Sequence, residues 1–313
     1  DGNEKKFFGE CDLVNKLMNE GYDDDKIFEK FNKHRNTYFS NGNFDVLFYK
    51  LKNMGINQVR LPITWCLIYD NKEYTVKGQT PDNKINEIKI TSGSNLVKDP
   101  YFGDDEEKYW VGIPISKIKN ILESAHRNGV KVLIDFHTFL GGSSDGSYSG
   151  TWPENPRYWI NKVIAKENMR TIMVNFCNWI KESRNKTALS GLYGITPMNE
   201  PAHMSGISPD KYPYWTDKET RFNEITEVLN ESIEVFRNSG LQGNGVKLIM
   251  NIIETSTNDF EANKFSVWNK WWKSATIHDE RVRWAGLDVH HYEAWYDASG
   301  CVKGAKTEAK DDS

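Results

Sequence analysis

The sequence lacks several features that mark other classes of protein. No apolar run approaches the ~20 residues of a membrane-spanning helix. The formal net charge of -4 argues against a nucleic-acid-binding protein, which usually carries a basic balance or a basic patch. No GxGxxG or Walker motif follows any predicted strand, which weakens a nucleotide-binding function. These absences favour a globular protein and leave its ligand open.

The four cysteines are too widely spaced for a zinc site. Cys11, Cys66, Cys177 and Cys301 form no CxxC pair, so we expect no metal. Cys177 lies in a helical pattern and is predicted to be a small buried hydrophobic residue. Disulfides among the other three cysteines remain open.

Aromatic residues, by contrast, are abundant. With 313 residues the chain can form one barrel-sized domain or two smaller ones. It contains 11 Trp, 14 Tyr and 15 Phe, which suits a groove where sugar rings stack on aromatic rings. The same excess equally suits a core rich in large side chains.

Two short motifs bear on the compartment. Asn185-Lys186-Thr187 and Asn230-Glu231-Ser232 are N-glycosylation sequons, and we expect a secreted or lumenal glycoprotein on this basis. The N-terminus shows neither an initiator Met nor a signal peptide and is interpreted as a processed or excised end.

The same order of elements recurs five times: a helix, a glycine, an apolar strand and a polar loop. The strands are predicted at residues 56–63, 130–136, 246–253 and 284–292, and in a run from residue 192 that stops at Asn199-Glu200-Pro201. This alternation implies an α/β fold with a parallel sheet, either a barrel or a doubly wound sheet.

Two segments fall outside this alternation. Residues 66–111 form a long polar insertion, predicted to be a loop that is functional or flexible, whose end at Tyr109-Trp110 could return to a cleft. Residues 300–313 form a polar tail without a core signal.

Polar residues gather at the predicted carboxyl ends of the strands. Pro201 cannot donate to a sheet ladder, so its strand stops there and leaves Glu200 at the tip. A barrel would bring all such tips into one mouth, where catalytic carboxylates lie. A solvated Glu200 and a purely structural ion pair at Arg60 are the simpler alternatives. The residues concerned are Arg60, His137, Asn199, Glu200, His290 and Tyr292.

Four motifs resemble one enzyme family. Arg60-Leu61-Pro62, Asp135-Phe136-His137, Asn199-Glu200-Pro201 and His290-His291-Tyr292, in this order and spacing, resemble glycoside hydrolase family five, and more narrowly its exo-β-1,3-glucanase branch. The resemblance spans roughly residues 10–296. It implies a (β/α)8 TIM barrel, of which residues 1–313 supply one partial domain with strands two to six of eight.

The resemblance also implies catalytic roles. Glu200 would be the general acid/base, and Asn199 would hold the 2-hydroxyl of the sugar. His290 and Tyr292 would flank the nucleophile, and Arg60 would hydrogen-bond that carboxylate and keep it ionised.

Further residues would bind the substrate. His137 would line the glucose subsite, and Trp295 would form one wall of the mouth. The branch usually grips the terminal glucose with an Asp-Asn pair, where this chain has Ser147-Tyr148 with Asp145 just upstream. The sugar and the linkage therefore stay open.

The nucleophile is the main departure from the family. Its glutamate is expected on the strand after the His-x-Tyr motif, beyond Ser313, and the first strand of the family is not found either. Glu254 and Glu293 are the internal alternatives, of which neither is favoured. A longer chain, a barrel whose missing segments lie on another polypeptide, and a degenerate barrel are the three explanations.

The sequence thus predicts a retaining glycoside hydrolase of the β-glucosidase or exo-glucanase type, acting on β-glucan or an oligosaccharide. The resemblance implies neither a metal nor an organic cofactor. The alternative is a non-catalytic carbohydrate-binding or structural protein on a degenerate hydrolase barrel.

Overall fold

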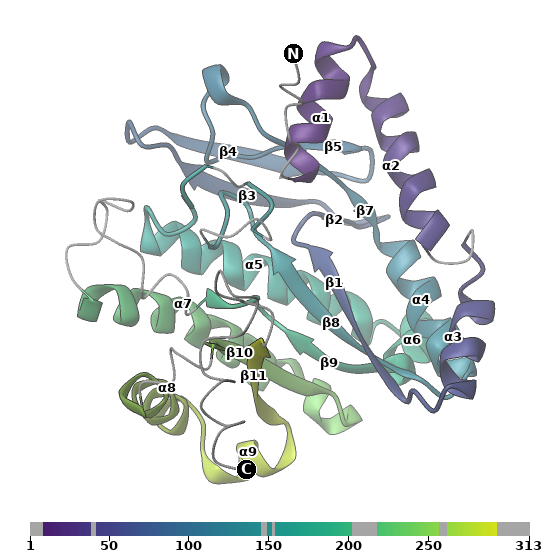
Figure 1. Cartoon of the computed structure of the whole chain (residues 1–313), viewed down its shortest axis with the longest axis vertical. Coiled ribbons are helices and arrows are strands. Elements are labelled where there is room, and N and C mark those ends of the chain that lie inside the picture. Colours follow the sequence, from purple (N-terminus) through teal and green to yellow (C-terminus); the bar gives the residue numbers. More distant parts are fainter. Residues whose placement is uncertain are drawn as a thin grey trace, which may run out of the picture.

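A parallel sheet forms the centre of the molecule (Figure 1). The computed structural model describes residues 9–38, 42–144, 149–151, 154–201, 218–256 and 262–292, with only the backbone at 38, 218–219, 252–256, 262–266 and 291–292. Five strands pair in the order β1-β8-β9-β10-β11, all parallel, which confirms the predicted α/β class. They are β1 Gln58–Thr64, β8 Lys131–Thr138, β9 Leu192–Thr196, β10 Lys247–Ser256 and β11 Ala285–Tyr292.

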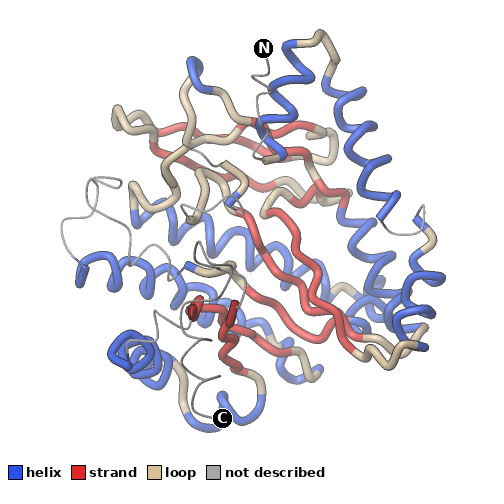
Figure 2. The backbone as a smooth tube through the Cα atoms, in the orientation of Figure 1, coloured by secondary structure: helices blue, strands red, loops and turns tan. Residues whose placement is uncertain are grey.

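Helices connect successive strands and enclose them (Figure 2). Consecutive crossover helices pack on each other, namely α3 with α4, α4 with α6, α5 with α7 and α7 with α8. Each turns an apolar stripe inward, as α4 does with Ile118, Ile121, Leu122 and Ala125. The helices are α3 Phe44–Asn53, α4 Ile115–Arg127, α5 Lys162–Lys181, α6 Lys186–Gly191, α7 Lys218–Ser239, α8 Ala262–Ala275 and α9 His278–Arg283, with short 3-10 turns at Asp104–Glu106, Ser183–Asn185 and Leu241–Asn244.

The sheet is strongly curved although it does not close. Within the described strands, β1 and β11 are the two edges. At a strand spacing of about 4.8 Å, a flat sheet would place these edges roughly 19 Å apart. However, Arg60 Nη1 on β1 lies 2.8 Å from His290 Nε2 on β11. The side chains at the carboxyl ends of the two edge strands therefore meet across the interior.

The insertion at residues 66–111 is folded rather than irregular. Strands β3 Tyr74–Gln79 and β4 Ile85–Ile90 form an antiparallel hairpin, and β5 Leu96–Lys98 pairs antiparallel with β6 Tyr109–Val111. Short strands β2 Leu67–Ile68 and β7 Ile113–Pro114 frame the insertion. The hairpins lie beyond the arrowheads of β1 and β8 in Figure 1, so they cover that end of the sheet.

Two N-terminal helices pack beside this insertion. They are α1 Glu10–Asn19 and α2 Asp24–Tyr38. They form a separate small apolar cluster in which Val14, Ile27 and Phe31 pack with Val111 of β6. The cluster attaches both helices to the insertion.

Asp99 holds the insertion against the loop that follows β8. Its fully buried carboxylate accepts hydrogen bonds from Gly141 N at 2.6 Å, Trp110 Nε1 at 2.8 Å and Tyr101 N at 3.0 Å. Burial raises the pKa of Asp99 to about 6, against the opposing effect of these three donors. One carboxylate thus satisfies donors from two segments more than 40 residues apart.

The described helices and cysteines add two findings. No helix in this part of the chain is both long and apolar enough to cross a membrane. Cys11, Cys66 and Cys177 are buried free thiols, so no disulfide joins these three, and Cys177 is buried in α5 as predicted. Burial raises the pKa of each thiol. Cys301 lies outside the described residues.

Replacing Asp99→Asn should destabilise the fold by about 2–3 kcal/mol, because the amide group cannot accept from all three buried donors. Urea denaturation would measure the loss. Asp105→Asn, at an exposed position of the same insertion, is the matched control. Equal stability of the two variants would show that Asp99 does not hold the insertion.

Candidate active site

Arg60 joins the carboxyl ends of four strands. Its Nη2 lies 3.0 Å from Asp135 Oδ2 on β8 and donates to Asn199 Oδ1, after β9, at 2.7 Å. Its Nη1 lies 2.8 Å from His290 Nε2 on β11. The structure therefore brings together the residues that the sequence placed at separate strand tips.

Asp135 is the carboxylate that Arg60 pairs with in this structure. It is fully buried, and its Oδ2 also lies 2.7 Å from His137 Nδ1. Residues 135 and 137 share one face of β8 because side chains alternate along a strand. Arg60 was predicted to hydrogen-bond the nucleophile. Among the described residues, the carboxylate that Arg60 pairs with is instead Asp135. The ion pair that was the simpler alternative for Arg60 is therefore present.

Glu200 lies at a strained bend after β9. The strand ends at Thr196, four residues earlier, and Glu200 has a φ of 47°, which L-residues rarely adopt. Its backbone N–H donates to Asn251 Oδ1 on β10 at 2.7 Å. Asn251 is fully buried and therefore fixes the backbone of Glu200 at this bend.

His290 lies between two carboxylates. Its Nδ1 is 2.5 Å from Glu200 Oε1, and its Nε2 is 3.2 Å from Asp288 Oδ2. Burial alone would lower the pKa of His290, but hydrogen bonds to Asp288 and Glu200 outweigh it and raise the pKa to about 9, against the charge of Arg60. The hydrogen bond from His290 lowers the pKa of Asp288.

The two partners of His290 Nε2 require different protonation states. Asp288 accepts a hydrogen bond from a protonated Nε2, whereas the Arg60 guanidinium can only donate and needs the lone pair. The charged imidazole therefore bonds Asp288, and the hydrogen bond from Arg60 forms only when Nε2 carries no proton. When Nε2 carries no proton, Nδ1 must carry one and donates it to Glu200 Oε1.

A pocket of about 320 Å³ opens beside His137. Glu10 and Arg35 form an ion pair in it at 2.8 Å, and Arg35 also donates to the carbonyl oxygens of Val111 and Gly112. Trp110 lines the pocket, which agrees with the expectation that the end of the insertion at residues 109–110 returns to a cleft. The lining consists of Gly9, Glu10, Arg35, Pro62, Ile63, Thr64, Trp110, Ile113, His137, Thr138 and Gly150.

Several predicted site residues lie outside the described residues: Asp145, Ser147, Tyr148, Glu293 and Trp295. Tyr292 ends β11, and only its backbone is described. Glu254 pairs with His290 in the β10–β11 register, again with its backbone alone. Their predicted roles stay predictions, as do those of Glu200, Asn199, Arg60 and His290.

The sequence did not single out Asn251, Asp288, Glu10 and Arg35 as site residues. A signal existed for Asp288, which precedes His290 by two residues on one strand and so shares its face. Asn251 sits inside an apolar strand, where a polar residue needs a partner. Glu10 and Arg35 gave no signal, because their pairing depends on how α1 and α2 pack.

Comparison with known proteins finds structural likeness alone. No protein-family model and no curated protein matches the chain. One similar solved structure is rutinosidase from Aspergillus niger, with 14% sequence identity, coverage of 81% of this chain and 55% of that chain, and a TM-score of 0.46. Another is the GH53 catalytic domain of Ignisphaera aggregans, with 14% identity, coverage of 80% of this chain and 52% of that chain, and a TM-score of 0.43. The β-glycosidase of Thermosphaera aggregans is also similar, with 13% identity, coverage of 80% of this chain and 55% of that chain, and a TM-score of 0.40.

The chain spans about half the length of each of these three structures. All three are glycosidases or glycoside hydrolases by name. At this identity and TM-score the likeness does not assign an activity to the chain.

Asp288→Asn should lower the pKa of His290 from about 9. The variant removes the negative charge that favours the imidazolium, so the pKa must fall. An NMR titration of the His290 ring measures this directly. His126→Gln, at an exposed position of α4, is the control and should leave the His290 titration unchanged. An unchanged titration in Asp288→Asn would contradict the geometry.

The raised pKa of His290 also predicts how stability depends on pH. The pKa of about 9 in the folded protein exceeds the usual histidine pKa of 6.5, so the stabilising contribution is full below pH 6.5 and is lost as pH rises through 9. Urea midpoints should fall over this window in the wild type. They should fall less in His290→Gln, and identical pH profiles of the two proteins would refute the linkage.

Proposed function

We propose that the chain is the catalytic part of a retaining glycoside hydrolase that acts on β-glucan, built on a (β/α)8 barrel. The observation that carries this proposal is the fixed position of Glu200, whose backbone is held by Asn251 and whose carboxyl group is held by His290. The contact between Arg60 and His290, from opposite edges of the sheet, supports barrel-like curvature.

Glu200 is proposed to act as the general acid/base. As the acid it donates a proton to the glycosidic oxygen, and as the base it then removes one from the attacking water. The hydrogen bond between Glu200 Oε1 and His290 Nδ1 gives the proton that Glu200 donates and recovers a path to the imidazole.

Asn199 is proposed to bind the 2-hydroxyl of the sugar. Arg60 donates to its Oδ1, which leaves the amide N–H groups to face other partners. A donor fixed in this way can hydrogen-bond a hydroxyl oxygen, and this contact strengthens in the oxocarbenium-like transition state. Arg60 thereby orients Asn199 as well as pairing with Asp135.

The pocket beside His137 is proposed to bind a sugar unit. Its carboxylate and guanidinium, from Glu10 and Arg35, can accept from and donate to neighbouring hydroxyls, and Trp110 supplies an aromatic wall. A retaining mechanism also needs a second carboxyl group about 5–5.5 Å from the first. We assign this nucleophile to a glutamate outside the described residues, as the resemblance to family five implies.

Replacing Glu200→Gln should lower kcat/KM on unactivated β-glucan by about a hundred- to ten-thousand-fold, because the leaving sugar then departs unprotonated. Aryl glucosides with good leaving groups should retain far more of their glycosylation rate. Glu87→Gln, an exposed glutamate of β4, is the control and should keep full activity. Wild-type turnover of β-glucan by Glu200→Gln would refute the assignment.

Trapping with a 2-fluoro-glucoside separates the hydrolase from the alternative. A retaining enzyme forms a stable glycosyl-enzyme with this reagent, which adds one sugar to the intact mass and identifies the nucleophile by peptide mapping. Sugar binding without any covalent label and without hydrolysis would favour a carbohydrate-binding protein on a degenerate barrel.

A further inference from the structure

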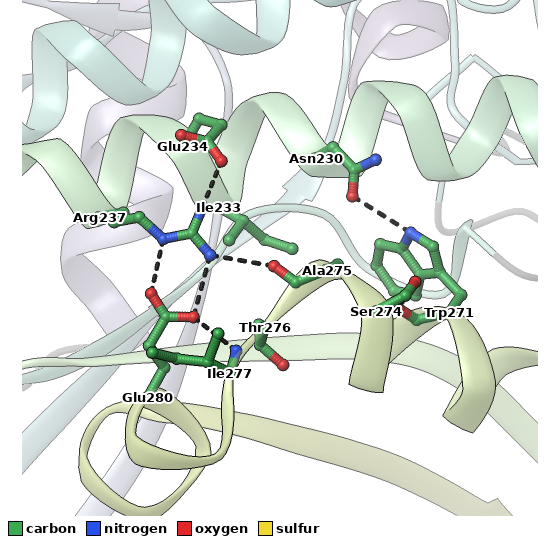
Figure 3. Close-up of a pocket in the computed structure, with 10 residues that line it drawn as sticks. All are labelled: Asn230, Ile233, Glu234, Arg237, Trp271, Ser274, Ala275, Thr276, Ile277 and Glu280. Carbon is green, nitrogen blue, oxygen red and sulfur yellow. Dashed lines mark hydrogen bonds and ion pairs between the residues drawn. The ribbon is translucent and has the colours of Figure 1, made fainter.

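A groove of about 640 Å³ lies between three outer helices, α7, α8 and α9 (Figure 3). Its walls mix polar and apolar residues, and an ion pair between Arg237 and Glu280 spans α7 and α9. The lining residues that matter below are Asn230 and Glu234 from α7 and Trp271 from α8. Nothing in the proposed catalytic mechanism uses this groove.

Asn230 is held in one orientation at one end of the groove. Its Oδ1 accepts from the indole Nε1 of Trp271 at 3.1 Å, and the amide nitrogen points away from that ring (Figure 3). The next residue, Glu231, turns the other way and pairs with Arg170 of α5 at 2.5 Å. Asn230 therefore lines one end of the groove, with its amide nitrogen directed away from the Trp271 ring.

Asn185, in the other sequon, has the opposite environment. Its side chain is only 1% exposed, and its Nδ2 donates to the carbonyl oxygen of Trp179 at 2.6 Å. A sugar on this nitrogen would need space that the packed interior does not have. The fold therefore accommodates a substituent on Asn230 and excludes one on Asn185.

We propose that Asn230 is the N-glycosylation site of this chain when it passes through a secretory pathway, that the folded protein carries no sugar on Asn185, and that the first N-acetylglucosamine lies at the Asn230 end of the groove. The Trp271 indole N–H keeps its bond to Oδ1, since glycosylation changes only the nitrogen. The exposed carboxylate of Glu234 can accept hydrogen bonds from the sugar.

The modification is a transfer from a lipid-linked oligosaccharide pyrophosphate. A bond forms between Asn230 Nδ2 and C1 of the N-acetylglucosamine, the bond from C1 to the pyrophosphate oxygen breaks, and the amide loses one proton as the lipid pyrophosphate leaves. Ser232 belongs to the motif that the transferase reads. In the folded chain Ser232 is fully buried and bonds the Leu229 carbonyl oxygen at 2.6 Å, so transfer precedes the packing of α7.

The test is to express the full chain behind a signal peptide in a eukaryotic secretory host and to map its glycans. Release by peptide N-glycosidase in ¹⁸O-water marks each occupied asparagine as labelled aspartate. We expect the label at residue 230 and none at residue 185. An unlabelled residue 230, or a label at residue 185 in the secreted protein, would overturn the proposal.

Matched variants assign the glycan mass without relying on the mapping. Ser232→Ala removes the motif while keeping the Asn230–Trp271 bond, and should lose the glycan mass, whereas Thr187→Ala should lose nothing. Release from the native protein should also be slower than from the denatured protein if the first sugar lies in the groove. Equal rates would refute the groove as its position.

Discussion

The Arg60 guanidinium is the interaction on which the site depends. It is always charged, and its planar fork of donors meets partners from three other elements at fixed angles. Asp135 supplies the balancing charge and is fully buried, so each partner needs the other. Removing one member of a buried pair costs about 3–5 kcal/mol, because it leaves the other charge without compensation. The contact with His290 also requires the sheet to curve, since these residues belong to its two edge strands.

The network around Glu200 combines strain with a shared proton. A positive φ at a residue other than glycine persists only where the surroundings hold it, and here Asn251 binds the backbone N–H. His290 bonds Glu200 through Nδ1, while Asp288 and Arg60 compete for its Nε2, so these four side chains are coupled in one protonation state. This coupling suits a residue that must give and take a proton in turn, as the proposed acid/base does.

The insertion at residues 66–111 gives the pocket its wall. Asp99 satisfies Trp110 and the loop after β8 together, and Trp110 then lies in the pocket with His137. Gly150 is required for this packing, because a Cβ there would lie 2.5 Å from the Trp110 ring. A segment that reads as a polar loop is thus a structural part of the candidate site.

The sequence by itself determined the parallel α/β class and the approximate positions of four of the five core strands, because apolar periodicity and helix-stopping glycines are local signals. It placed the end of the remaining strand at Pro201, whereas β9 ends at Thr196 and Glu200 lies in the bend beyond it. It also placed Arg60, His137, Asn199, Glu200 and His290 at those ends. Tertiary structure alone decided most of their partners, since Asn251 and Asp135 act through contacts between strands. Tertiary structure also made Asn185 and Asn230 different in exposure, although both carry the same local motif, because burial depends on what packs against each segment.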